Sequence, residues 1–355
     1  MKVLLVNIHM RCGGAERVMA WLADQLVDAG HEVTLATWFV STDDFYPLLP
    51  AVTRVGVWDS RGASRFDFHV SRLRFMRTVR RLARDVDVVL SFQTDTNLAT
   101  LIATAGLPAR VVVSERSTPI ALEQRWRMRV MGGPVVRRRA AGFVVQTAEI
   151  AERFAAMWGI ADAVVIPNAP AIEVAPPVIR ENVILNVGRF APVKDHATLI
   201  RAWARIASLH PEWKLRIVGE GPLRSVIDAL IDQHGIASRT DIVEPMRDIA
   251  REYQAASIFA FPSLHEGFPN ALLEAAASGC ACVATNCPGG GADILDQGRA
   301  GVLVPVGDDQ AMAAALDALI NDRNRREELG RAAEKSTSRF TQESVFAQWL
   351  AVLSQ

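Results

Sequence analysis

Short runs of β-branched and other apolar residues alternate with helix-length amphipathic segments along the whole chain. This alternation is typical of a parallel sheet whose two faces are both covered by helices. In the first half the runs are KVLLVNI (2–8), EVTLAT (32–37), DVVLSF (87–92), RVVVSER (110–116), GFVVQT (142–147) and AVVIPN (163–168). In the second half they are VILNVGR (183–189), KLRIVG (214–219), DIVE (241–244), IFAFPS (258–263), CACVAT (280–285) and GVLVPV (301–306). Because the series restarts, the pattern predicts two doubly wound α/β domains.

The break between the two series is a proline-rich stretch, residues 167–182, with almost no helical periodicity. We interpret it as the connection between domains. A chain of 355 residues is also too long for one ordinary core. We therefore expect domains at 1–168 and 169–340, followed by a helix over 341–355 whose apolar side chains are available to pack back on the first domain.

The composition argues against several classes of protein. Basic and acidic residues balance at 39 each, but residues 1–177 carry 21 basic and 17 acidic side chains, so the excess positive charge lies in the first half. The four cysteines are too few for a disulfide framework, and three of them lie in or beside an apolar run, so we expect packing and no metal site. We expect no secretory signal, and no apolar run approaches the roughly 18 residues that span a membrane.

Two loops of the second half combine glycine with basic residues directly after a predicted strand. NVGRFAPVKDH (186–196) supplies Arg189 and Lys194, and VGEGPLR (218–224) follows the next strand. A guanidinium can bind two phosphate oxygens while an ammonium neutralises charge from another side, so this pair suits a diphosphate. Taken alone, each loop is also compatible with solvated basic residues or a simple tight turn.

The stretch HEGFPNALLEA (265–275) has a carboxylate on each side of a helix start. Pro269 suits the first helical turn, and strong helix formers continue to Gly279. The unpaired amides of a helix start attract anions, so a phosphate can bind there, with Glu266 and Glu274 accepting hydrogen bonds from hydroxyls on its two sides. A nucleotide sugar has that layout. The alternative is that the glutamates only stabilise the helix dipole.

Taken in order, GRFAPVKDH, GEGPL and Glu266-Gly-Phe-Pro-Asn-x-x-x-Glu274 resemble the retaining glycosyltransferases of glycosyltransferase family 4, which have the two-domain GT-B fold. GGAERV (13–18), IPN (166–168) and CPGGGADIL (287–295) also correspond to motifs of that family, so the resemblance spans nearly the whole chain. It implies two Rossmann-like domains that face each other across a cleft. It also implies no cofactor beyond a nucleotide-sugar co-substrate, for which we expect a UDP-sugar.

The resemblance implies roles for individual residues. Arg189 and Lys194 would hold the donor diphosphate, and Glu274 would bind the ribose hydroxyls. Glu266 would bind hydroxyls of the transferred sugar, which makes it a catalytic candidate. The other expected donor contacts are Gly13, Gly14, Gly267, Phe268 and Asn270. The glycines at 289–291 would either let their loop close on the ligand or only form a turn.

The stretch VVVSERSTP (111–119) departs from the family pattern. Many members have a histidine at the end of the corresponding strand, whereas this chain has Ser114, Glu115 and Arg116, so the role of that histidine cannot be carried over. Similar sequences occur in members that build cell-surface polysaccharides or lipid-linked oligosaccharides, some with N-acetylhexosamine donors. We predict that Glu115 or Arg116 lines the catalytic site; the alternative is a structural ion pair.

Two arginine-rich stretches concentrate the positive charge of the first half. Residues 61–84 contain eight arginines, and RWRMRVMGGPVVRRR (125–139) contains six and no acid. Apolar residues are interleaved with the second set, which suits a membrane surface with guanidinium groups on lipid phosphates. A solvated helix face is the alternative. Without a recognisable nucleic-acid-binding module, we expect no nucleic-acid partner.

The sequence as a whole predicts a cytoplasmic glycosyltransferase, peripheral on the inner face of the membrane if the arginines bind lipid. It would move a sugar, N-acetylhexosamine being one option, from a UDP-sugar to a hydroxyl of a glycan or lipid-linked acceptor, with retention of configuration. Two alternatives stay open. One is a sugar-nucleotide epimerase of the same fold, and the other is an inactive sugar-nucleotide-binding protein.

Overall fold

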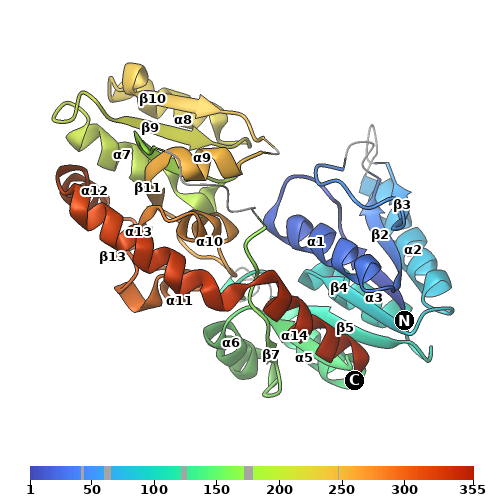
Figure 1. The fold of residues 1–355 in the computed structure, drawn as a ribbon. Coiled ribbons are helices and arrows are strands. Elements are labelled where there is room, and N and C mark those ends of the chain that lie inside the picture. The colour runs from blue at the N-terminus through green and yellow to red at the C-terminus, as the bar shows by residue number, and fades with distance from the viewer. Residues whose placement is uncertain (41–43, 60–64, 121–125, 172–178, 247) are drawn as a thin grey trace. The chain divides into compact units, whose positions relative to one another are not determined.

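The computed structural model describes residues 1–40, 44–59, 65–120, 126–171, 179–246 and 248–355 (Figure 1). The chain divides into two compact units. Unit 1 consists of Met1–Asn168 with Glu343–Gln355, and unit 2 consists of Ala169–Gln342. Arg61, Arg125 and residues 172–178 of the predicted connection lie outside the described residues. Within the described ranges, no helix has the length and apolar character that a membrane span requires.

Unit 1 is built on a seven-stranded sheet of order β3-β2-β1-β4-β5-β6-β7, in which every neighbouring pair is parallel. Its strands are β1 (Lys2–Asn7), β2 (Glu32–Phe39), β3 (Thr53–Trp58), β4 (Val88–Phe92), β5 (Arg110–Ser114), β6 (Gly142–Val145) and β7 (Val164–Val165). Its helices are α1 (Gly14–Asp28), α2 (Arg65–Leu82), α3 (Thr94–Ala103), α5 (Trp126–Arg139), α6 (Ala148–Trp158) and α14 (Gln342–Ser354). The strand order reverses between β1 and β4, where doubly wound sheets bind ligands.

Both faces of this sheet are buried. Leu4 and Val6 of β1 belong to one core cluster, while Val3 and Leu5, also buried, alternate with them. Successive side chains of a strand point to opposite faces, so a strand covered on both sides needs an unbroken apolar run. This requirement explains the sequence pattern from which the fold was predicted.

Helix α14 returns from the end of the chain to unit 1 (Figure 1). Trp349 is fully buried, with its ring centroid 5.8 Å from that of Phe92. Phe346 packs edge-on against Trp21 of α1, and Arg110 Nη1 donates to the Leu353 carbonyl at 3.1 Å. The last helix therefore contributes to the core beside β4 and β5.

Unit 2 is built on a six-stranded parallel sheet of order β10-β9-β8-β11-β12-β13. Its strands are β8 (Glu181–Val187), β9 (Lys214–Val218), β10 (Thr240–Val243), β11 (Ala256–Phe261), β12 (Ala281–Thr285) and β13 (Val302–Val304). Its helices are α7 (His196–Ile206), α8 (Arg224–Gln233), α9 (Ala250–Ala255), α10 (Asn270–Ala277), α11 (Gly291–Ile294), α12 (Asp309–Asn321) and α13 (Arg323–Thr337). Ile184 and Leu185 of β8 lie in different core clusters, so this sheet also has two buried faces. The predicted fold class is confirmed.

One strand was not predicted from the sequence. β3 lies at the edge of its sheet, and its TRVGVW sequence is only partly buried. A strand whose side chains are not buried on both faces of the sheet needs no continuous apolar run. The pattern that reveals the central strands is therefore missing at this position.

Candidate functional site

The carboxyl end of the unit 2 sheet brings two predicted motifs together. β8 and β11 are neighbours at the point where the strand order reverses. The loop after β8 carries Lys194, and the loop after β11 carries Glu266. The backbone N–H of Leu264 donates to the Val193 carbonyl at 2.8 Å and joins the two loops. A ligand site is expected at such a reversal.

Lys194 and Glu266 form a close ion pair, with Nζ 2.6 Å from Oε1. Their side chains are 23% and 15% exposed, so the pair is mostly shielded from water but can still be reached. Lys194 Nζ also lies 5.7 Å from the ring centroid of Phe261, a cation–π contact. Arg189, in the same loop as Lys194, is exposed. Two cations therefore lie after the carboxyl end of β8, and their positive charge can bind a diphosphate.

Helix α10 begins four residues after Glu266, with Pro269 as its N-cap. Gly267 and Phe268 are buried between them, and Phe268 packs edge-on against Phe340 with ring centroids 5.4 Å apart. Asn270, the first helical residue, is partly exposed. The amides of this helix start favour an anion, which adds to the field of the neighbouring cations.

Glu274 lies in the second turn of α10 and is only 1% exposed. A buried carboxylate is costly unless hydrogen bonds satisfy it. The structure thus brings Lys194, Glu266 and the start of α10 together at the carboxyl end of the sheet and places Glu274 below the surface. Its ribose-binding role remains a prediction.

The loop after β12 packs against the segment that carries Glu266. The backbone N–H of Glu266 donates to the Pro288 carbonyl at 2.9 Å, and that of Gly290 donates to the Gly267 carbonyl at 3.2 Å. Gly289 has φ +119°, and a Cβ built there would lie 2.1 Å from the Glu266 carbonyl oxygen. Glycine is therefore required at this position by both conformation and space. The loop fixes the backbone from which Glu266 projects.

In unit 1, the candidate catalytic residue Glu115 follows β5 and is almost fully buried. Its carboxylate accepts hydrogen bonds from Thr94 Oγ1 at 2.7 Å and from Asn97 Nδ2 at 2.9 Å. Both donors lie in the first turns of α3, so the carboxylate is held at that helix start. Burial raises the pKa of Glu115 to about 7, while the two hydrogen bonds act in the opposite direction.

This raised pKa predicts a pH-dependent stability. Between about pH 4.5 and pH 7 the folded protein keeps a proton on Glu115 that the unfolded chain has lost, so the free energy of unfolding falls as pH rises. We expect a loss of about 3 kcal/mol over this window, from about 1.4 kcal/mol per pKa unit. Urea unfolding at several pH values should show a flatter profile for Glu115→Gln. Parallel profiles for the two proteins would contradict the assignment.

The Arg116 side chain contacts residues other than those that hold Glu115. Its guanidinium donates to Asn168 Oδ1 through Nη2 and to Ser114 Oγ through Nη1 at 3.5 Å. It also lies 4.8 Å from the ring centroid of Phe92 and 5.9 Å from that of Trp349. Burial lowers the pKa of Arg116 to about 9. These contacts link the end of β5 to α14 and to the last residue of the first segment of unit 1.

The glycine loop of unit 1 contains residues that the sequence analysis did not assign. Gly13 is the N-cap of α1 and Gly14 its first residue. Glu16, in the first turn, is 4% exposed, and its Oε1 lies 3.4 Å from His9 Nδ1. Gln93 Nε2 donates to the same oxygen at 3.2 Å. The signal in the sequence was an acid two residues after a pair of glycines at a strand-to-helix turn.

The cysteines follow the packing expectation. Cys280, Cys282 and Cys287 are buried and free, and burial raises the pKa of Cys280 and Cys287 to about 11. Such thiols stay neutral near pH 7 and behave as small apolar groups. Over the described ranges, no group of three or more His, Cys, Asp or Glu side chains could hold a metal ion.

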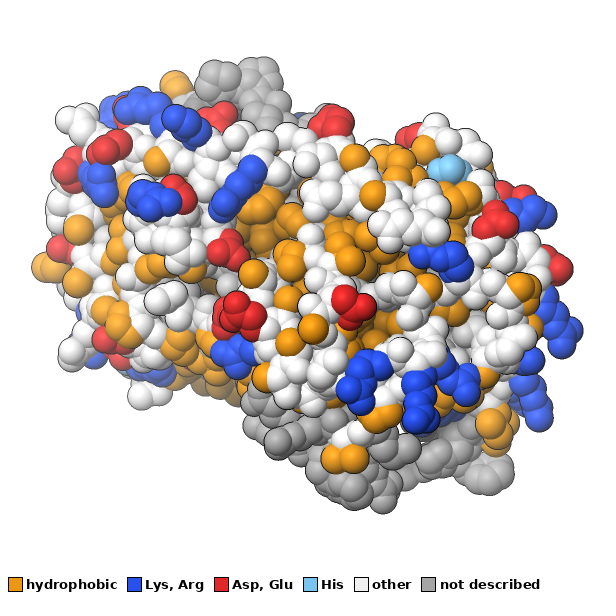
Figure 2. Space-filling model, turned by 90° about the horizontal axis from the view of Figure 1, so that it is seen from below, with side chains coloured by type: hydrophobic (Ala, Val, Ile, Leu, Met, Phe, Trp, Pro, Cys, Tyr) orange, Lys and Arg blue, Asp and Glu red, His pale blue; other side chains and the backbone are white. Residues whose placement is uncertain are grey.

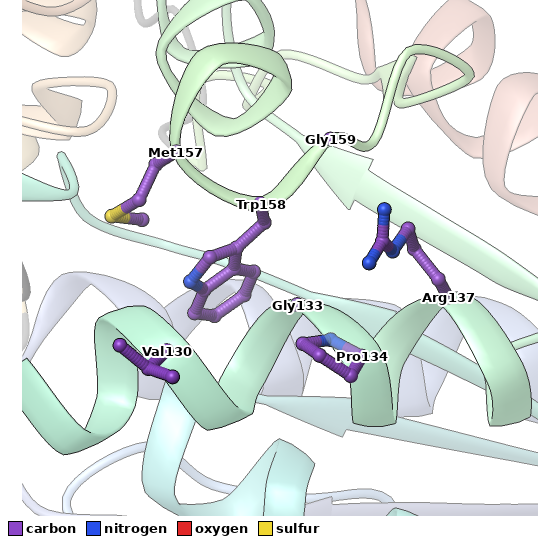
Figure 3. Close-up of a pocket in the computed structure, with 7 residues that line it drawn as sticks. All are labelled: Val130, Gly133, Pro134, Arg137, Met157, Trp158 and Gly159. Atoms are coloured by element: carbon purple, nitrogen blue, oxygen red, sulfur yellow. The ribbon is translucent and has the colours of Figure 1, made fainter.

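A hollow of about 390 Å³ lies between α5 and α6 of unit 1 (Figure 3). It is lined by Val130, Gly133, Pro134, Arg137, Met157, Trp158 and Gly159. Arg137 stands at one end, while the Trp158 ring lies across the glycine-proline segment of α5 (Figure 3). The hollow therefore lies beside the helix that carries the second arginine-rich stretch and has one cation, Arg137, in its wall.

Two family models match the chain. The model described as "Glycosyl transferase 4-like domain" matches residues 13–169, and "Glycosyl transferases group 1" matches residues 172–336. These ranges correspond to most of unit 1 and most of unit 2. The chain belongs to the GT-B glycosyltransferases. The prediction of a glycosyltransferase is thereby confirmed, whereas the nucleotide-sugar donor and the retention of configuration stay predictions.

Individual relatives agree with the family. The glycosyltransferase is 25% identical, over 100% of its length and 99% of the relative, to a Campylobacter jejuni α-1,4-N-acetyl-D-galactosaminyltransferase named for an undecaprenol-diphosphate-linked saccharide. It is 35% identical over 164 residues to a Streptomyces coelicolor exopolysaccharide phosphotransferase, covering 45% of this chain but only 17% of that protein. The structure of Anabaena HepE in complex with UDP and glucose matches with a TM-score of 0.87 and 19% identity, over 100% and 99% of the two chains.

Proposed function

We propose that this glycosyltransferase transfers a sugar, with N-acetylhexosamine one option, from a UDP-sugar to a hydroxyl of a glycan or lipid-linked acceptor, with retention, in cell-surface polysaccharide or glycoconjugate synthesis. The observation that carries the proposal is the Lys194–Glu266 pair beside the start of α10. At one strand-order reversal lie a cation, an acid and a helix N-terminus. Together they can bind a diphosphate and the hydroxyls of the sugar attached to it.

Two of the similar proteins support the finer chemistry of this proposal. The Anabaena protein was solved with UDP and glucose, which supports a UDP-sugar donor. The Campylobacter relative is named for transfer of N-acetylgalactosamine to a saccharide on undecaprenyl diphosphate, which supports a lipid-linked acceptor. Because the Streptomyces relative aligns over only a sixth of its length, it adds nothing about the acceptor.

The proposed chemistry assigns each group a task. When the bond between the sugar and the diphosphate breaks, negative charge grows on the leaving phosphate. Lys194, Arg189 and the α10 amides would stabilise that charge. When the donor binds, Lys194 would pair with a phosphate oxygen in place of Glu266. Glu266 would then accept hydrogen bonds from hydroxyls of the sugar. Such an exchange keeps the ammonium paired in both states, and the sugar hydroxyls replace it as hydrogen-bond donors to the Glu266 carboxylate.

A nucleotide panel tests the proposal. Thermal unfolding would be followed with UDP, GDP, ADP and their sugars, and transfer would be followed from UDP-N-acetylgalactosamine or UDP-glucose to an undecaprenyl-diphosphate-linked saccharide. We expect the uridine compounds to raise the unfolding temperature and one of the sugars to be transferred. An epimerised sugar nucleotide formed without acceptor would favour an epimerase. Nucleotide binding without any transfer would favour an inactive binding protein.

We also propose that unit 1 attaches to an anionic membrane through its arginine-rich helices. Arg137, Arg138 and Arg139 at the end of α5 are exposed. Exposed apolar side chains accompany them on packed neighbouring helices: Leu73 of α2 is 57% exposed, Ile102 of α3 46% and Val130 of α5 63%. Figure 2 shows Lys and Arg side chains interspersed with hydrophobic ones on the face that it displays. Basic residues and apolar groups together favour interfacial binding.

Charge reversal tests this attachment. We expect Arg137→Glu/Arg138→Glu/Arg139→Glu to weaken cosedimentation with phosphatidylglycerol vesicles by about 100-fold or more, from roughly 1 kcal/mol per basic residue. The matched control is Arg323→Glu/Arg325→Glu/Arg331→Glu, which makes the same change in net charge on exposed positions of α13. Equal sedimentation of the first variant and the wild-type protein would exclude this patch as the anchor. Equal loss in both variants would indicate only a general charge effect.

A further inference from the structure

The hollow between α5 and α6 is bordered by a polar group that the fold leaves unsatisfied. Trp158, the last residue of α6, is 3% exposed, and its buried Nε1 has no hydrogen-bond partner in the part of the chain that the structure describes. In Figure 3 this nitrogen faces the end of the hollow where Val130 and Met157 lie. Trp203 and Trp349 also have unpartnered ring nitrogens, but of the three rings only that of Trp158 lines the hollow. An acceptor bound there would satisfy the N–H.

Helix α5 is shaped to receive the Trp158 ring. A Cβ at Gly132 would lie 2.5 Å from Trp158 Cζ2, and one at Gly133 would lie 2.9 Å from the Trp158 carbonyl oxygen. Glycine at both positions therefore lets the indole lie across the helix (Figure 3). Two consecutive glycines weaken a helix interior, so this close approach is made at a cost in helix stability.

Pro134 changes the hydrogen bonding of the same face of α5. It lies inside the helix, and because proline has no N–H it cannot donate to the carbonyl four residues earlier, that of Val130. Val130, Pro134 and Arg137 follow one another at helical spacing, and all three line the hollow. The Val130 carbonyl thus lacks its usual helical donor on the face that borders the hollow.

The other end of the hollow is cationic. The Arg137 guanidinium lies over the end of α6, where a Cβ at Gly159 would be 2.9 Å from Arg137 Nη1 (Figure 3). Gly159 is the left-handed C-cap of α6, with φ +65°, so the chain can turn there without a side chain that would displace the guanidinium. A ligand that spans the hollow would meet a cation at one end, and a neutral donor and acceptor at the other.

We propose that the hollow binds the headgroup of phosphatidylglycerol; this inference rests on the proposed membrane attachment of unit 1. The phosphodiester would pair with Arg137, whose planar guanidinium suits two phosphate oxygens. A glycerol hydroxyl would accept a hydrogen bond from Trp158 Nε1 and donate one to the Val130 carbonyl. The volume of about 390 Å³ falls in the lower part of the range of small-molecule sites.

The surroundings favour a lipid over free glycerol phosphate. Arg138 and Arg139 are exposed beside the hollow, Val130 in its wall is 63% exposed, and Ile102 of the neighbouring α3 is 46% exposed. Cations and apolar side chains together bring this part of unit 1 to an anionic bilayer. Arg137 is the charged member of the lining, so the ammonium or carboxylate of phosphatidylserine would lose hydration at the neutral end without gaining a counter-charge.

Vesicles of equal surface charge test this inference. Cosedimentation would compare phosphatidylcholine vesicles that contain the same fraction of phosphatidylglycerol or of phosphatidylserine. We expect the wild-type protein to bind the phosphatidylglycerol vesicles roughly 10-fold more tightly. Trp158→Phe removes the N–H and Arg137→Gln removes the cation, so each should bring this ratio close to one. The matched control is Arg138→Gln, at an exposed position of α5 outside the lining. It should weaken binding to both vesicles about fivefold and keep the ratio.

The outcomes separate the headgroup site from the attachment. Equal binding of the two vesicles by the wild-type protein, or equal ratios in Arg137→Gln and Arg138→Gln, would overturn the headgroup site and leave a charge-driven attachment standing. Binding to neither kind of vesicle would reject the attachment and this inference with it. Release from phosphatidylglycerol vesicles by micromolar glycerol 3-phosphate would identify a soluble ligand and overturn the lipid assignment. Trp158 packs in the core, so Arg137→Gln decides the test if Trp158→Phe unfolds at a lower temperature.

Discussion

Lys194→Ala is expected to lower kcat/KM for sugar transfer roughly 100- to 1,000-fold, the range seen when one preorganised donor to a developing negative charge is removed. Lys194 is partly buried against Phe261 and paired with Glu266 at 2.6 Å, so its position is fixed before any ligand arrives. Its removal leaves the carboxylate charge of Glu266 without the ammonium that balances it, and this negative charge repels the diphosphate. Steady-state kinetics with a UDP-sugar measures the effect.

The matched control is Lys214→Ala, also in unit 2. Lys214 pairs with Asp241 at 3.7 Å, but its side chain is 51% exposed. Exposed ion pairs of this kind contribute about 0–1 kcal/mol, so activity should stay within about threefold of the wild type. If Lys194→Ala behaved like this control, the diphosphate would have to bind elsewhere.

Glu266 and Glu274 separate two roles in the same experiment. Glu266→Gln keeps the shape of the side chain but releases Lys194, so we expect donor binding to persist while kcat falls. Glu274→Ala should mainly weaken UDP binding, as judged by the thermal shift. The reverse pattern would undo both assignments. Glu274 is 1% exposed, so its variant also needs an unfolding measurement without ligand to separate lost binding from lost stability.

The sequence was sufficient for most of the fold because both sheets are covered on two faces. Each predicted apolar run contains a strand. Among the described residues the strand that was not predicted is β3, which is only partly buried and so has no continuous apolar run. In the central strands, burial on both sides forces consecutive apolar residues, and that requirement is written directly into the sequence.

The site was less predictable, because its contacts join residues that are distant in the chain. The motifs identified Lys194 and Glu266 separately, each acting on a ligand, but not the ion pair between them. Glu115 was predicted to line the catalytic site, and that stays a prediction, but the sequence did not indicate that Thr94 and Asn97 would hold its carboxylate. Whether a polar side chain after a strand turns outward or caps a neighbouring helix depends on packing that periodicity does not encode.

Gly289→Ala is expected to reduce the free energy of unfolding of the protein by about 3 kcal/mol or more and to abolish transfer. The φ of +119° is essentially restricted to glycine, and its cost for alanine is of order 1–3 kcal/mol. The new methyl group would in addition meet the Glu266 carbonyl oxygen at 2.1 Å. The loop must move, and it carries with it the hydrogen bond from the Glu266 N–H to Pro288.

Gly307→Ala separates the two contributions, since Gly307 has φ +75° and nothing within 4 Å of its missing Cβ. We expect this control to lose about 1–2 kcal/mol and to keep its activity. Thermal unfolding should resolve the difference, because each kcal/mol shifts the midpoint by about 2–4 °C in a domain of this size. Equal midpoints for the two variants would show that the 289–291 loop moves to accommodate the methyl group without a further loss of stability. Unchanged transfer by Gly289→Ala would then mean that the position of the Glu266 backbone does not limit catalysis.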